Sequence, residues 1–265
     1  MQKIVNEIDT LQSEINKHRP LDPDLLKQIK EYYRIGLTYT SNALEGNTLT
    51  ESETKVVLEE GITIGGKPLK DHLEAQGASE AYDFVYQLIS KKEISEEDIK
   101  KLHKLFYYRI DEKNAGTYRN KQVFLTGSKY PTTKPDKIAS EMSKFIANLE
   151  QFRETEHPVV AAALAHKEFV FIHPFIDPAY AVNCVIPRQV ITGYGGQVGN
   201  GRVARLFMNL ILLQEGYNIA IIPPIMRAKY ISSLEKAHTN DSDFLEFIAQ
   251  MLKETQKDYI RLFES

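Results

Sequence analysis

Residues 173–177 read His-Pro-Phe-Ile-Asp, and residues 199–205 read Gly-Asn-Gly-Arg-Val-Ala-Arg. The two glycines of the second stretch let a backbone approach an anion closely, and Arg202 opens a segment with helical periodicity. Backbone N–H groups at the start of a helix favour phosphate, and so does the helix dipole. Arg202 and Arg205 add guanidinium donors that match phosphate oxygens. The two stretches therefore predict a helical fold with a phosphate site at a helix N-terminus.

His173 and Asp177 carry the groups that phosphate chemistry needs beside such a helix. A histidine with the ordinary pKa of about 6.5 can take a proton from an attacking hydroxyl at neutral pH. A carboxylate is a hard oxygen ligand for Mg²⁺, which commonly bridges phosphates. Each residue alone is more often part of a loop or surface, and only the ordered set predicts a catalytic site.

Joined end to end, the two stretches read HPFID–GNGRVAR, which resembles the signature HPFx(D/E)GNGRxxR of the Fic family. The resemblance extends from about Thr38 to about Asn240 and includes the segment Gly116-Thr117-Tyr118-Arg119. It implies a mainly α fold, namely a Fic-type helical bundle with a short β-hairpin flap.

The resemblance also implies an activity: the transfer of AMP from ATP, with Mg²⁺ as cofactor, to a Ser, Thr or Tyr hydroxyl of a target protein or of the chain itself. His173 would deprotonate the hydroxyl, and Asp177 would hold Mg²⁺. The residues that would bind the ATP phosphates are Gly199, Asn200, Gly201, Arg202 and Arg205.

Residues 41–47 read Ser-Asn-Ala-Leu-Glu-Gly-Asn and resemble the inhibitory pattern (S/T)xxxE(G/N) of the same family. Alone, this short pattern reads more simply as a helix end with a glycine cap. The resemblance implies that Ser41 and Glu45 are inhibitory, with Glu45 paired to Arg205 so that the γ-phosphate is excluded. A carboxylate and a phosphate compete for the same guanidinium donors. The motif precedes the core, as in the class with an N-terminal inhibitory helix.

Residues 122–125 and 130–132 flank a turn-like segment and predict a short hairpin. The resemblance implies that this hairpin is the flap that holds the target segment by strand addition, a mode that tolerates varied target sequences. The flap residues are Val123, Phe124, Leu125, Thr126 and Gly127.

The family signature is contiguous, but here residues 178–198 separate Asp177 from Gly199. This insert has a single charged residue, Arg188, and its apolar runs could pair as a hairpin. A distorted phosphate loop would affect catalysis more than folding. The insert therefore leaves open a catalytically inactive nucleotide-binding module. The resemblance leaves open two further activities, namely removal of AMP with water positioned by Glu45 and transfer of another phosphate-containing group.

Apolar residues recur with helical spacing along most of the chain, and no internal repeat interrupts them. We expect residues 1–60 to form N-terminal helices that carry the inhibitory motif at 41–46. Residues 61–265 would form the Fic core, with the insert inside its signature. The helices expected are 4–15, 24–44, 51–60, 69–90, 95–108, 137–152, 158–171, 202–215, 224–237 and 243–263.

The composition is that of a globular protein, with 42% apolar and 26% charged residues among 265. A formal charge of −3 argues against a broad nucleic-acid or anionic-membrane surface. The single cysteine, Cys184, excludes an internal disulfide, and no apolar run approaches the length of a membrane span or a signal peptide. We expect a cytoplasmic protein whose partners are ATP and a target protein. Family members often dimerise, so a homodimer is also considered.

Overall fold

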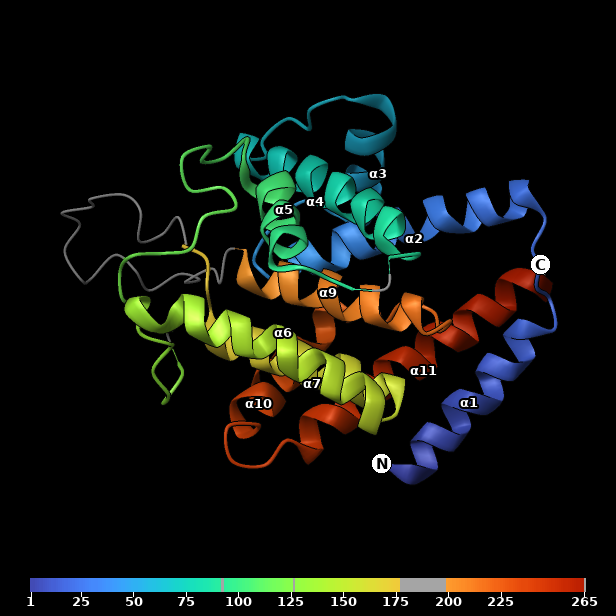
Figure 1. Ribbon diagram of the computed structural model, residues 1–265. Helices are drawn as coiled ribbons and strands as arrows, with labels where there is room; N and C mark the ends of the chain where they lie inside the picture. The colour runs from blue at the N-terminus through green and yellow to red at the C-terminus, as the bar shows by residue number, and fades with distance from the viewer. Residues whose placement is uncertain (92, 126, 177–198, 265) are drawn as a thin grey trace.

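The computed structural model describes residues 1–91, 93–125, 127–176 and 199–264 of the chain. The regular secondary structure of these residues is helical (Figure 1), as the sequence predicts. The α-helices are α1 Gln2–Asn16, α2 Pro23–Ala43, α3 Glu51–Glu60, α4 Leu69–Leu88, α5 Glu96–Tyr107, α6 Ile138–Thr155, α7 Pro158–Ile172, α9 Asn200–Gln214, α10 Arg227–Lys236 and α11 Ser242–Glu264, with 3-10 turns η1 Pro135–Lys137 and η2 Pro224–Met226. None of the described helices is long and apolar enough to cross a membrane.

Helix α9 runs through the middle of the molecule, with α4 and α5 on one side and α6 and α7 on the other (Figure 1). Its closest neighbour is α7, and α4 and α5 also pack on it. Every residue from Asn200 to Leu212 is buried, and a helix buried all round is a core element. The N-terminus of α9, where the sequence predicts phosphate binding, is therefore fixed by the core.

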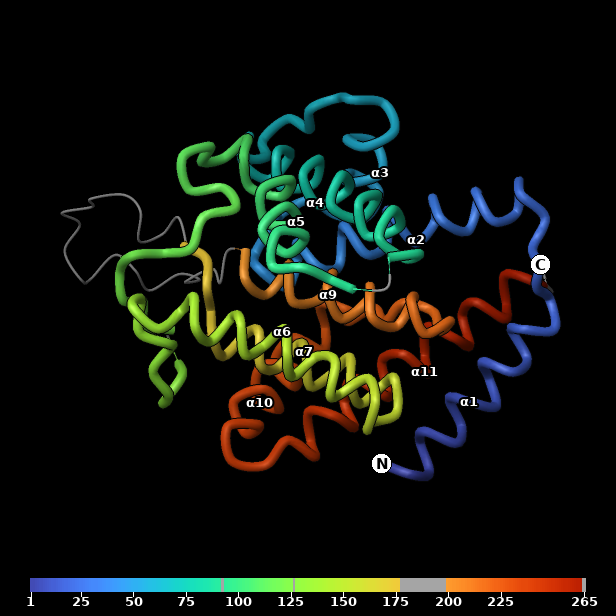
Figure 2. The backbone as a smooth tube through the Cα atoms, viewed as in Figure 1, coloured from blue at the N-terminus to red at the C-terminus, as the bar shows by residue number. Residues whose placement is uncertain are grey.

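The N-terminal helices belong to the same hydrophobic core. Helix α1 packs along α11 (Figure 2), and α2 packs against α4 and touches α9. Ile4 and Ile8 of α1 lie in one continuous cluster with Val203 and Phe207 of α9. A division of the chain near residue 60 consequently stays a prediction from the motifs.

Local signals in the sequence account for the helix ends. Ser95 and Asp98 form the predicted capping box, with the Asp98 N–H donating to Ser95 Oγ at 3.3 Å and the Ser95 N–H to Asp98 Oδ2 at 2.8 Å. Pro158 stands in the first turn of α7, where its missing N–H costs nothing. Each predicted helix is present, and the ends agree within a few residues.

The β-hairpin predicted near residue 127 is not shown, because the described residues around it form no strand ladder. Side chains close this loop instead: Thr132 Oγ1 donates to the Val123 carbonyl at 2.8 Å, and Gln122 Nε2 donates to the Thr132 carbonyl at 3.2 Å. Pro131 has no N–H to give to a ladder, which explains part of the difference. The fold class is unaffected.

Candidate active site

His173 is the residue that follows α7, and its backbone has the left-handed φ of 52°. Non-glycine residues adopt this conformation only where their surroundings hold them in it. Arg119 supplies that support, since its Nε donates to the His173 carbonyl at 2.8 Å and its own N–H donates to the Pro174 carbonyl at 2.9 Å. The turn that presents His173 is thus fixed by the motif residue Arg119.

The imidazole of His173 is neutral at pH 7. Burial, as the main cause, and the charge of Arg119 together lower the pKa of His173 to about 3, although the Val170 carbonyl works in the opposite direction. Arg119 keeps its own charge, although burial lowers its pKa to about 10. A neutral imidazole has the lone pair that a general base needs, but a pKa of about 3 makes His173 a weaker base than the ordinary value of about 6.5 assumed from the sequence.

Asn200 joins the two halves of the interrupted motif. Its Oδ1 accepts from the Phe175 N–H at 3.0 Å, and its Nδ2 donates to the Phe175 carbonyl at 3.1 Å. Both residues are buried, so the pair is shielded from water. The turn after His173 is therefore bonded directly to the first residue of α9, across the 178–198 insert.

The N-terminus of α9 has the form of an anion site. Its cap is Gly199, which has a φ of 111° and no side chain to accept from the N–H groups of the first turn. Gly201 faces Glu45 so closely that an added Cβ would lie 2.5 Å from Glu45 Oε1. The Glu45 carboxylate therefore lies against the turn where the sequence predicts phosphate.

Glu45 and Arg205 form the ion pair that the resemblance implies, with Glu45 Oε1 and Arg205 Nη2 2.7 Å apart. Ser41 completes the arrangement, because Arg205 Nε donates to its Oγ and Nη2 to its carbonyl, both at 2.9 Å. Burial alone would lower the pKa of Arg205, but Glu45 and the Tyr230 hydroxyl outweigh burial and hold it above its ordinary value. Arg205 is thus a buried, fully charged cation.

Arg202 lies in a different environment. Its guanidinium lies 3.7 Å from the centre of the Phe106 ring, and its Nη1 is 2.9 Å from Asn42 Oδ1 and 3.2 Å from Glu74 Oε1. Arg202 therefore joins α9 to α2, α4 and α5. Asn42 and Glu74 escaped the sequence reasoning because a carboxylate or amide on a helix usually faces solvent.

His103 of α5 is a second residue that sequence reasoning missed. The Gly116 N–H donates to its Nδ1 at 2.9 Å, its ring stacks on Phe175 with centroids 4.0 Å apart, and an added Cβ at Gly199 would lie 2.9 Å from its Nε2. One buried imidazole thus contacts three separate motif segments. On the buried face of α5, a histidine reads as an ordinary core residue, so no pattern singled it out.

Tyr230 and His166 lie behind Arg205. The Tyr230 hydroxyl is 3.4 Å from Arg205 Nη1 and 2.9 Å from His166 Nε2. Burial and the charge of Arg205 lower the pKa of His166 to about 3, so its ring is neutral and Nε2 can accept from the hydroxyl. This contact was also missed, because Tyr230 lies 25 residues from Arg205 in the sequence.

The loop at residues 122–134 is anchored on α10. Ser128 Oγ and the Lys129 N–H each donate to the Glu235 carboxylate at 2.8 Å. Val123 is buried, whereas the Phe124 side chain is 69% exposed. Arg119 ties the start of the loop to the His173 turn, because its Nη1 donates to the Lys121 carbonyl at 2.8 Å.

Some of the predicted residues lie outside the described part of the chain. These are the metal ligand Asp177, the flap residue Thr126 and the whole insert at 178–198. The remaining residues predicted for catalysis, nucleotide binding and inhibition fall into two groups that Asn200 connects: the His173 turn, and the start of α9 with Ser41 and Glu45. The other flap residues, Val123, Phe124, Leu125 and Gly127, belong to neither group.

Comparison of the sequence with known proteins gives matches to a single family. A family model described as "Fic/DOC family" matches residues 93–178. The protein named "Protein adenylyltransferase Fic" of Drosophila willistoni is 34% identical over 225 residues, which are 84% of this chain and 41% of that protein. "Protein adenylyltransferase fic-1" of Caenorhabditis elegans is 30% identical over 263 residues, 97% of this chain and 47% of that protein. The chain spans less than half the length of these curated relatives.

Solved structures extend the likeness over nearly the whole chain. Fic-1 from C. elegans superposes with a TM-score of 0.83 at 29% identity, covering 99% of this chain and 72% of that one. A Fic domain containing signaling protein from Bacteroides thetaiotaomicron superposes with a TM-score of 0.81 at 26% identity, covering 97% of both chains. The helical bundle around α9 is therefore shared with solved proteins on both sides of the 178–198 insert.

Proposed function

The chain is a Fic-domain protein, and from that premise we propose that it is an adenylyltransferase that moves AMP from ATP to a hydroxyl side chain of a target protein. Glu45 inhibits the reaction in the arrangement described above. The relatives that carry the name adenylyltransferase are about twice as long as this chain. The activity of the whole relatives is therefore a proposal for this chain.

The position of the Glu45 carboxylate supports this proposal most directly. The carboxylate lies against Gly201 in the first turn of α9 and accepts from Arg205 at 2.7 Å. Carboxylates and phosphates use the same donors, namely a guanidinium and the N–H groups at a helix N-terminus. A site that holds this carboxylate therefore has the chemistry to hold an ATP phosphate, and one ligand excludes the other.

His173 and Asn200 would serve the chemical step. The neutral imidazole takes the proton of the target hydroxyl, whose oxygen then forms a bond to the α-phosphorus of ATP. The bond from that phosphorus to the bridging oxygen breaks, and pyrophosphate leaves. Asn200 keeps the His173 turn and the phosphate cradle in fixed relation through its two bonds to Phe175. Gly199 and Gly201 give the phosphates access to the backbone, and Arg202 secures the base of α9.

Magnesium is part of the proposal, with Asp177 as its protein ligand. Mg²⁺ in such sites takes one or two carboxylates together with phosphate oxygens, and when bound it neutralises phosphate charge.

The flap residues 123–127 would hold the target segment beside His173. A cytoplasmic location and a homodimer complete the set of proposals that come from the sequence.

ATP labelled separately at its α- and γ-phosphates tests the reaction. The wild-type chain and Glu45→Ala would be incubated with Mg²⁺ and each form, with the chain itself and the proteins of a cell lysate as acceptors. We expect label on protein from the α-position only, and more of it with Glu45→Ala. The same measurement with residues 178–198 deleted should give still more, because the deletion restores the contiguous motif.

The other outcomes separate the alternatives. Label from the γ-position would mean a kinase-like transfer. No label from either position, even after both changes, would mean an inactive nucleotide-binding module. Loss of AMP from premodified protein, accelerated by the chain and dependent on Glu45, would favour removal of AMP.

His173→Ala tests the general base. We expect AMP transfer to fall by about 10²–10⁴-fold while ATP binding persists, because the imidazole acts on the hydroxyl. His18→Ala is the matched control, since His18 is exposed and stacks on Phe263 far from the site in sequence and fold. Undiminished transfer by His173→Ala would place the base elsewhere.

A further inference from the structure

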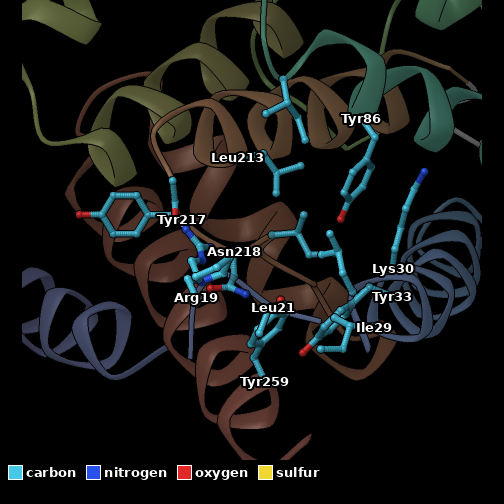
Figure 3. Close-up of a pocket in the computed structure, with 15 residues that line it drawn as sticks. Arg19, Leu21, Ile29, Lys30, Tyr33, Tyr86, Leu213, Tyr217, Asn218 and Tyr259 are labelled. Carbon is cyan, nitrogen blue, oxygen red and sulfur yellow. Dashed lines mark hydrogen bonds between the residues drawn. The ribbon is translucent and has the colours of Figure 1, made fainter. Parts of the chain in front are cut away.

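A cavity of about 620 Å³ lies at the connection between α1 and α2, and Figure 3 shows the residues that line it. The connection between α1 and α2, the first half of α2 and the segment after α9 form its walls, and α11 contributes Tyr259. None of the residues proposed above for catalysis, nucleotide binding or inhibition lines it. This volume suits a small organic molecule.

Aromatic and aliphatic side chains form most of the wall. Tyr33 and Tyr259 are stacked with their ring centroids 5.6 Å apart and their planes 10° from parallel. Tyr86, Ile29 and Leu213 also line the cavity, and Figure 3 shows these side chains around one common space. Walls made of rings and aliphatic groups favour a flat, apolar ligand.

The charged side chains of the wall are positive. Arg19 and Lys30 both line the cavity, and no acidic side chain is among the lining residues. Lys30 already pairs with Asp83 at 3.3 Å. Arg19 donates through Nη1 to the Gly216 carbonyl at 3.1 Å but has no ion pair within the described ranges. The unbalanced charge in the wall is therefore that of Arg19.

We propose that this cavity binds a planar aromatic molecule with an anionic group, with the ring beside Tyr33 and Leu213 and the anion at Arg19. The ring meets apolar and aromatic surface, and the anion meets a guanidinium that can donate two parallel hydrogen bonds. Asn218 offers one more contact to a ligand that carries an N–H or O–H group, because it is buried in the wall and its Oδ1, which can only accept, finds no donor in the described part of the chain.

The site is coupled to Glu45 through the two helices that they share, and this step rests on the proposed function. Helix α2 lines the cavity with Ile29 and Tyr33 and ends just before Glu45. Helix α9 lines it with Leu213, eight residues or about 12 Å beyond Arg205. The cavity is formed while Glu45 contacts Arg205, and a ligand favours the arrangement that it fits. Opening of the Glu45–Arg205 pair that moved α2 or α9 would change the cavity, so we expect a ligand that fits its present shape to strengthen inhibition and to weaken ATP binding.

Binding of 2-naphthoate, a planar aromatic carboxylate, tests the site itself. The chain has no tryptophan, so the fluorescence anisotropy of the probe is read against little protein emission. We expect Arg19→Gln to weaken binding by about tenfold, the loss typical of a charge-assisted hydrogen bond. Lys17→Gln is the matched control: Lys17 is exposed in the same connection, does not line the cavity, and should leave binding unchanged.

The neutral alcohol 2-naphthalenemethanol adds a second control. Its binding should be equal in the wild type and in Arg19→Gln, because it has no charge for Arg19 to recognise. Two results would overturn the site: equal naphthoate affinity in these two proteins, or no naphthoate binding at millimolar concentration.

Naphthoate binding with and without saturating ATP tests the coupling. We expect ATP to raise the dissociation constant of naphthoate about fivefold or more in the wild type, and to have no effect in Glu45→Ala. Competition that persists in Glu45→Ala would mean that ATP enters this cavity, and no effect in a wild type that binds ATP would mean no coupling; either result overturns that step. A wild type that binds no ATP would overturn the proposed function and the coupling, while the Arg19 result would still decide the site.

Discussion

Arg202 and Arg205 lie on the same helix, three residues apart, and each is buried beside a carboxylate, but the two carboxylates are held differently. Glu74, the partner of Arg202, belongs to the interior of α4 and also contacts Asn47 at 2.9 Å and Lys70 at 3.5 Å. Glu45, the partner of Arg205, lies in the turn after α2, next to Gly46 with its φ of 92°. One acid is fixed in a helix, and the other is in a turn.

This difference indicates that the Arg202–Glu74 and Arg205–Glu45 pairs have different roles, although their chemistry is similar. Burial raises the pKa of Glu74, but Arg202 and Lys70 outweigh it and hold the pKa below its ordinary value, so the carboxylate stays charged. That pair joins α9 to α4, and both of its residues are held inside helices. The Glu45 pair lies at the N-terminus of α9, where a phosphate can replace the carboxylate. We infer that the first pair supports the fold and the second regulates the site.

Breaking the Glu74 pair should therefore have the largest effect, and the effect should be on stability. Arg202→Ala leaves the Glu74 carboxylate buried without its main partner, which typically costs about 3–5 kcal/mol. The free energy of unfolding from urea titration measures it. Arg261→Ala is the control, because Arg261 is exposed on α11 and its pair with Asp258 is worth little. A loss for Arg202→Ala as small as that of the control would remove the distinction between the two pairs.

Breaking the Glu45 pair should act on activity more than on stability. Glu45→Ala frees both the guanidinium of Arg205 and the turn at Gly201, so AMP transfer should rise by about tenfold or more, as expected when a charged hydrogen bond no longer competes. The rate of α-label incorporation measures this. Arg205 keeps its two bonds to Ser41, whereas Arg202→Ala also removes the stacking on Phe106 and the bond to Asn42. We therefore expect a smaller loss of unfolding free energy for Glu45→Ala than for Arg202→Ala.

Two further variants show whether charge or bulk inhibits. Glu45→Gln removes the charge and keeps the size, so activation by Gln as well as Ala would indicate the ion pair, and activation by Ala alone would indicate steric exclusion at Gly201. Glu59→Gln is the control for the substitution itself, because Glu59 is an exposed acid at the end of α3. Faster unfolding without faster transfer in Glu45→Ala would contradict the regulatory assignment.

The sequence predicted the helix ends and one of the two ion pairs, but not the other pair. Helix ends are local, so patterns such as Ser95 with Asp98 predicted them closely. The Glu45–Arg205 pair spans 160 residues and was predicted through family resemblance, since no local pattern joins the two positions. The Glu74–Arg202 pair has no such motif and was missed. The hairpin was predicted from strand propensity, but the side chains of Gln122 and Thr132 supply the bonds that a ladder would have made.

Tyr230→Phe should have the smallest effect, and it refines the comparison because Tyr230 contacts Arg205 and not Arg202. The change removes one bond of 2.9 Å to His166 and a weaker one of 3.4 Å to Arg205, so we expect a loss of about 1 kcal/mol in unfolding free energy. Tyr259→Phe controls for loss of a hydroxyl, because the Tyr259 hydroxyl makes no hydrogen bond to the residues that the structure describes. If Tyr230 helps to hold Arg205 for Glu45, the variant should also transfer AMP slightly faster than the wild type, and combining it with Glu45→Ala should add nothing. An additional gain in the double variant would show that Tyr230 acts on the transferase independently of the inhibitory pair, because changes that act through one contact are not additive.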